Sequence, residues 1–134
     1  MTALQKAPLI LHITIETLAA LSFIFQPHTQ LPGATREAEL ILASYGGLLL
    51  TTNLVCGVFV LLPGFDATAG LVSLCVGTYH AWPMWRAYSR LSSSSRRRVV
   101  GPSQVLGGPG VHLAVHAVCL VGLVAAGWSA VAMS

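Results

Sequence analysis

The chain has 134 residues, of which 54% are hydrophobic and only 8% are charged, and its formal net charge is +3. Soluble domains usually carry about a quarter charged residues, so this composition favours a polytopic membrane protein. The length allows one compact domain over residues 1–134 and excludes a separate soluble module. The positive charge gathers in one loop without interleaved aromatic residues, which argues against a nucleic-acid partner.

Four apolar segments are each near the length that crosses a hydrocarbon core of about 30 Å. They predict an all-α, integral membrane four-helix bundle with up-down-up-down topology. The predicted spans cover residues 8–25, 38–62, 67–88 and 109–133. Pro8 suits a first helical turn, Gln26-Pro27 and Pro63-Gly64 end the first two helices, and Asp66 is placed to cap the third.

Small residues let helices approach closely in a membrane. Ser44, Gly46 and Gly47 therefore predict a packing face on the second helix, and Gly70 and Gly77 predict one on the third.

The third helix ends in an aromatic segment that contains Pro83. Pro83 cannot donate a backbone hydrogen bond, which predicts a kink near Tyr79. The segment also predicts an interfacial belt with a snorkelling cation, made of Trp82, Trp85, Tyr88 and Arg86.

A flexible, basic loop is expected over residues 90–108. Most cations lie in the loops after the first and third helices, namely Arg36, Arg86, Arg90, Arg96, Arg97 and Arg98. The positive-inside rule then places these loops in the cytoplasm and both termini on the non-cytoplasmic side. The endoplasmic reticulum is one candidate membrane, and the sequence does not identify which membrane it is.

Glu16 is the one carboxylate far from a predicted loop, and an ionisable group inside a bilayer is a functional candidate. At 1.5 Å per residue, Glu16 lies about 12 Å from the non-cytoplasmic side, while His80 and His116 lie about 12 and 10 Å from the cytoplasmic side. Asn53 lies at a similar depth on the second helix. We therefore expect one polar residue from each helix to converge in a shared pocket.

His12 lies four residues before Glu16, on the same helix face, and His112 and His116 repeat this spacing. Burial favours the neutral form of a carboxyl group, and an adjacent imidazole can share its proton. Such a pair suits proton transfer to or from a lipophilic substrate. The predicted catalytic residues are Glu16, His116, His80 and His12.

The predicted substrate-binding residues are Asn53, Tyr79, Trp82, His112 and Tyr45. Structural alternatives remain open for several of them. For Asn53 a hydrogen bond between helices is the favoured interpretation. Membership of the interfacial belt is favoured for Tyr79 and Trp82, and a structural role is equally open for His12 near its helix end. No metal-ligand motif is visible, because Cys56, Cys75 and Cys119 lack CxxC spacing.

The segment His12-Ile-Thr-Ile-Glu16-Thr resembles the sterol isomerases of the emopamil-binding protein family, within the EXPERA group of four-helix membrane domains. The resemblance implies that His12 and Glu16 move protons at a double bond. Tyr79-His80 stands where the family would have an acidic motif. The chain also looks like small fungal membrane proteins encoded beside natural-product pathways.

These observations predict a membrane isomerase or cyclase that needs no cofactor and acts on a terpenoid, sterol or polyketide. It would work by proton transfer or by templated pericyclic closure. The alternatives are a non-catalytic lipid-binding or assembly subunit and a bis-histidine haem protein ligated by His80 and His116. The expected partners are a lipophilic small molecule and the bilayer, and both monomer and homo-oligomer remain open.

Overall fold

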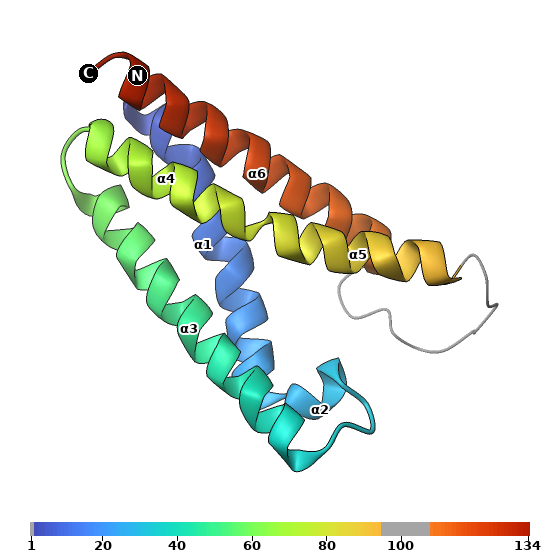
Figure 1. The fold of residues 1–134 in the computed structure, drawn as a ribbon. Coiled ribbons are helices and arrows are strands. Elements are labelled where there is room, and N and C mark those ends of the chain that lie inside the picture. The colour runs from blue at the N-terminus through green and yellow to red at the C-terminus, as the bar shows by residue number, and fades with distance from the viewer. Residues whose placement is uncertain (1, 95–107) are drawn as a thin grey trace. The chain divides into compact units, whose positions relative to one another are not determined.

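The computed structural model describes residues 2–94 and 108–134, and all secondary structure in these residues is helical (Figure 1). The predicted all-α class is therefore confirmed. The helices are α1 (Thr2–Phe25), α2 (Pro27–Gln30), α3 (Arg36–Leu61), α4 (Ala67–Tyr79), α5 (Ala81–Ser94) and α6 (Gly108–Ala132). They form two compact units, the first over Met1–Phe65 and the second over Asp66–Ser134.

Three of these helices are long and apolar enough to cross a membrane, namely α1 over Ala3–Phe25, α3 and α6. The third predicted span, residues 67–88, is instead divided between α4 with 13 residues and α5 with 14. At 1.5 Å per residue each of these two helices is about 20 Å long, which is shorter than a hydrocarbon core of about 30 Å. A fourth crossing would therefore need both helices together.

Several helix ends follow the predicted signals. Helix α1 ends at Phe25, directly before Gln26-Pro27. The Asp66 carboxylate accepts a 2.9 Å hydrogen bond from the backbone N–H of Ala69 and so caps α4 as predicted. Thr35 caps α3 in the same way, by accepting a hydrogen bond from Ala38 N–H at 3.3 Å.

Two predicted boundaries were wrong. Helix α1 begins at Thr2 rather than at Pro8, because the proline removes one backbone hydrogen bond without ending the helix that precedes it. The loop expected to begin at Arg90 is still helical there, since α5 continues to Ser94. The last residue of that predicted loop, Gly108, begins α6, and residues 95–107 lie outside the described residues.

In the first unit, α1 and α3 lie side by side and run in opposite directions (Figure 1). The buried residues of each helix recur at intervals of three or four, as in the seam of a coiled coil. On α1 they are Leu9, His12, Glu16, Ala20 and Phe23. On α3 they are Gly46, Leu49, Asn53 and Cys56. The helices thus bury one stripe each, and large apolar side chains such as Leu18 and Leu48 stay exposed.

Gly46 brings the backbones of α1 and α3 together. A Cβ atom at Gly46 would lie 2.8 Å from the carbonyl oxygen of Ala20, whereas one at Gly47 would meet nothing within 4 Å. The predicted packing role is therefore confirmed for Gly46 and wrong for Gly47. Ser44 is exposed, and its hydroxyl donates to the Leu40 carbonyl of its own helix at 2.9 Å.

Lys6 holds the other end of this helix pair. Its ammonium group donates to the carbonyl of Val60 at 3.0 Å and to that of Leu62, both at the C-terminal end of α3. The last carbonyls of a helix have no partner within the helix and carry partial negative charge. A single cation from α1 thus satisfies two carbonyls at this helix end.

In the second unit, α6 runs alongside both α4 and α5 (Figure 1). Helices α4 and α6 meet at two glycines. A Cβ at Gly70 would lie 2.9 Å from the Gly127 carbonyl oxygen, and one at Gly127 would lie 2.6 Å from that of Gly70. Gly77 packs less closely, with its nearest contact at 3.4 Å to Val124. The packing role predicted for Gly70 is confirmed, and Gly127 shares it. At Gly77 a Cβ would make ordinary contacts, so close approach does not require glycine there.

Replacing Gly46 by Ala should lower the free energy of unfolding by about 1–3 kcal/mol, because the new methyl group overlaps the Ala20 carbonyl. The matched control is Gly47→Ala, one residue away in open space. It should be neutral or slightly stabilising. Thermal unfolding in detergent micelles measures both, and equal effects would refute close packing at Gly46.

Replacing Lys6 by Met should lower the stability of the first unit by about 1–3 kcal/mol, because it removes charged hydrogen bonds to the end of α3. The control is Arg36→Met, which removes an exposed 3.8 Å ion pair with Glu39 that contributes about 1 kcal/mol or less. Denaturant titration in micelles compares the two variants. A smaller loss for Lys6→Met would contradict the proposed role of this contact.

Candidate functional site

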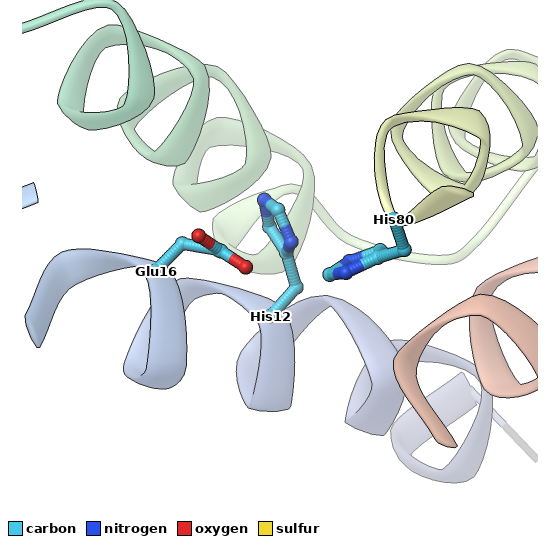
Figure 2. Close-up of side chains that lie close together, drawn as sticks. All are labelled: His12, Glu16 and His80. Atoms are coloured by element: carbon cyan, nitrogen blue, oxygen red, sulfur yellow. The ribbon is translucent and has the colours of Figure 1, made fainter. Parts of the chain in front are cut away.

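The first cluster of polar groups lies within the buried stripe of α1. His12 and Glu16 are 0% and 1% exposed, and they extend from the same side of the helix one turn apart (Figure 2). This spacing confirms that the two side chains share a face, as predicted. Their neighbours in the stripe, Leu9 and Ala20, are apolar and fully buried. The carboxyl and imidazole groups therefore occupy positions that aliphatic residues usually take.

Asn53 faces α1 from α3. Its Nδ2 donates a 3.0 Å hydrogen bond to the hydroxyl of Thr17, the residue that follows Glu16. This contact agrees with the favoured interpretation of Asn53 as a link between helices. Its buried amide oxygen has no hydrogen-bond partner among residues 2–94 and 108–134, which leaves an acceptor for a ligand.

Tyr45 lies further along the same hairpin. Its ring stacks on Phe23, with centroids 5.8 Å apart. Phe23 is seven residues beyond Glu16, which corresponds to about 10 Å along the helix axis. This contact gives Tyr45 a role in packing α3 against α1. Its predicted contact with substrate stays a prediction.

The second cluster is built around a break between α4 and α5. Pro83 has no N–H to donate to the Tyr79 carbonyl, so α4 ends at Tyr79. His80 bonds back to Gly77 in a tighter turn at 3.1 Å, and the helix resumes with Met84 N–H donating to the His80 carbonyl at 3.2 Å. The predicted kink near Tyr79 is thus confirmed, and it places His80 at the junction.

His80 meets His116 of α6 at this junction. Their Nδ1 atoms are 2.8 Å apart, their ring centroids are 5.1 Å apart, and both side chains are buried. One ring must donate and the other accept, so the two imidazoles share a proton. The sequence placed these two histidines at similar depth, and the structure brings them into direct contact.

The other predicted residues of this unit lie around the pair. The His112 ring is 6.0 Å from that of His116, one turn away on α6, and is half-buried. The Tyr79 ring stands edge-on to His80 at 5.2 Å. Trp82 is 74% exposed, as expected for a belt residue.

The two clusters offer different chemistry. A carboxyl group beside an imidazole can act as a general acid or base, whereas two hydrogen-bonded imidazoles can hold or pass on a proton. Haem ligation would require His80 and His116 to move apart, because a 2.8 Å contact joins the nitrogens directly. Glu16 belongs to one unit and this histidine pair to the other, so the predicted shared pocket stays a prediction.

Sequence reasoning missed three residues that make contacts between helices, namely Thr17, Gly127 and Lys6. Thr17 follows Glu16 directly, but a threonine on an apolar helix usually bonds to its own backbone, as Thr14 does with the Ile10 carbonyl at 2.8 Å. Gly127 could have been found from its place in the regular stripe of small residues on α6. Nothing in the local sequence of Lys6 points to its partners on α3.

Comparison with models of known protein families, with curated proteins and with solved structures gives no match.

Replacing His116 by Leu should lower the stability of the second unit by about 1–3 kcal/mol, because His80 would lose its buried hydrogen bond. The control is His112→Leu on the same face of α6. That ring is half-buried, so its removal should cost less. Unfolding of both variants in micelles measures the difference, and equal losses would argue against a special role for the pair.

Proposed function

We propose that this protein is a membrane-embedded enzyme that isomerises or cyclises a lipophilic metabolite, with Glu16 as its general acid and base. The observation that carries the proposal is the burial of Glu16 and His12, one turn apart on a long apolar helix. A glutamate contributes little to packing that a leucine would not. Its burial therefore favours a chemical role over a structural one.

The membrane setting makes this argument stronger. Three helices have the length and apolar composition needed to cross a bilayer. An ionisable group in such a helix is expensive, and it is usually retained where a substrate or a proton needs it. The resemblance of His12 and Glu16 to the EXPERA isomerases supports the same class of reaction.

The proposed reaction conserves all atoms. The Glu16 carboxylic acid transfers its proton to one carbon of a substrate double bond, and a carbocation forms on the neighbouring carbon. The resulting carboxylate then removes a proton from a different carbon, and the double bond re-forms at the new position. Glu16 ends the cycle protonated, so the enzyme needs no oxidant or reductant.

The remaining polar residues have proposed supporting roles. His12 orients the carboxyl group and shares its proton. Asn53 presents its amide oxygen to a hydroxyl group of the substrate. The His80–His116 pair stores or relays a proton within its own unit.

We propose four crossings, in which α4 and α5 together form the third. The loops after the first and third crossings, which carry most arginines, then face the cytoplasm, and both termini face the other side. The endoplasmic reticulum is compatible with this orientation.

The proposal is tested by incubating the purified protein in D₂O with sterols, terpenoids and unsaturated polyketides and measuring the mass of each product. Glu16 exchanges its acidic proton with solvent between turnovers, so proton transfer places one solvent deuterium in the isomerised product. A pericyclic closure places none. Glu16→Gln should lower the rate of deuterium incorporation by about 10²–10⁴-fold, since it removes general acid–base catalysis.

The control is Glu37→Gln, because Glu37 lies in the first turn of α3 and is fully exposed. This variant should retain the parental rate. Product without deuterium, formed at a rate that Glu16→Gln only weakens, would favour the pericyclic version. Full activity in Glu16→Gln would refute both versions, and no conversion of any substrate by the parent protein would favour the lipid-binding alternative.

A further inference from the structure

Helix α5 differs from every long helix of this chain in its surface. Only one narrow side of it is buried, at Pro83 and Ala87, and the rest is amphipathic. Aromatic side chains form one part of the exposed surface, with Trp82, Trp85 and Tyr88 at 74%, 66% and 57% exposure. The Trp85 and Tyr88 rings lie 6.2 Å apart.

Two arginines form the adjacent part of this surface. Arg86 and Arg90 are one turn apart and exposed. We call the surface made of Trp82, Trp85, Arg86, Tyr88 and Arg90 the α5 belt. It combines ring surfaces that favour the membrane–water boundary with cations that favour phosphate groups.

The position of the α5 belt along the axis of α6 follows from the contact between His80 and His116. The hydrogen bond between His80 and His116 fixes the register of the two helices. From that level, Arg86 lies about 9 Å and Arg90 about 15 Å along α5, while the start of α6 at Gly108 lies about 12 Å along α6. Helix α6 is one of the three helices that can cross a membrane. The two arginines therefore bracket the point where a membrane-crossing helix begins.

No acidic residue of this unit neutralises these cations. The four carboxylates of the sequence are Glu16, Glu37, Glu39 and Asp66, so none follows residue 66. Asp66 caps the opposite end of α4. Within residues 2–94 and 108–134 neither Arg86 nor Arg90 forms an ion pair, whereas Arg36 has Glu39 at 3.8 Å. The α5 belt thus presents uncompensated positive charge.

We propose that the α5 belt binds anionic phospholipid headgroups, with Arg86 and Arg90 on the phosphates and the three aromatic rings at the level of the glycerol backbone. The inference rests on the proposed membrane placement of α6. An acidic protein would satisfy the arginines, but it would leave two tryptophans in water beside them. A lipid headgroup and its acyl chains satisfy both halves of the surface.

The test uses tryptophan fluorescence of the full chain in vesicles. Trp128→Phe removes the only other tryptophan, which is on α6, so that emission comes from Trp82 and Trp85. The vesicles contain phosphatidylcholine with a small, fixed fraction of brominated lipid, which quenches on contact. The brominated lipid is either phosphatidylserine or phosphatidylcholine, with bromine near the headgroup end of the chain or near its tip.

We expect shallow bromines to quench more strongly than deep ones. Brominated phosphatidylserine should also quench more than brominated phosphatidylcholine, consistent with about fivefold local enrichment per arginine. The excess should disappear in high salt and in the double variant Arg86→Gln/Arg90→Gln. It should persist in Arg36→Gln, whose arginine already has an acidic partner.

The outcomes separate the two proposals. No quenching by shallow bromines would overturn the membrane placement itself. Strong shallow quenching that is equal for both headgroups would overturn only the lipid preference. An excess that survives Arg86→Gln/Arg90→Gln but disappears in Arg96→Gln/Arg97→Gln/Arg98→Gln would assign lipid binding to the arginine run that follows in the sequence and would refute the role of the α5 belt.

Discussion

Close backbone contact at a few glycines is the constraint on which both helix pairs depend. Gly46 lets α3 approach the Ala20 carbonyl of α1, and Gly70 and Gly127 let α4 and α6 touch through their backbones. In the proposed membrane setting the hydrophobic effect supplies little attraction between helices, so van der Waals contact at small residues has to supply it. The glycines lie towards one end of each pair. The helices of each pair can therefore pack closely at that end. The buried stripe of each pair then continues to positions that carry polar side chains.

Those polar side chains occupy the same stripe as the packing residues. Glu16 lies four residues from Ala20 on α1, and His116 lies three from Cys119 on α6. In each helix pair the glycine contacts lie towards one end, and the buried ionisable side chains lie further along the same interface. The closest backbone contacts thus lie apart from the ionisable side chains of each pair. Substitutions at the ionisable positions would therefore leave the glycine contacts intact.

Composition and helix periodicity predicted the all-α class and several helix ends, because apolar run lengths, prolines and N-caps act locally. The prediction was weaker where the decisive contact is tertiary. Gly46 and Gly47 look alike in the sequence, and only the direction of α1 distinguishes them. The pairing of His80 with His116 was anticipated from depth. The bonds from Asn53 to Thr17 and from Lys6 to the end of α3 depend on helix register. Register is set by packing across the whole interface, which no short motif records.

The missing backbone hydrogen bond at Pro83 has a mechanical consequence. In a continuous helix the direction of the second half is dictated by the first, since every turn is tied to the one before it. Here the helical hydrogen-bond pattern is interrupted at Tyr79, and the direction of α5 is determined by its contacts with α6 and by the His80–His116 hydrogen bond. The hydrogen bond between His80 and His116 therefore lies at the point where the direction of α5 is set. A change in the protonation of this pair would act on the break between α4 and α5, where the backbone can change direction more easily than within a continuous helix.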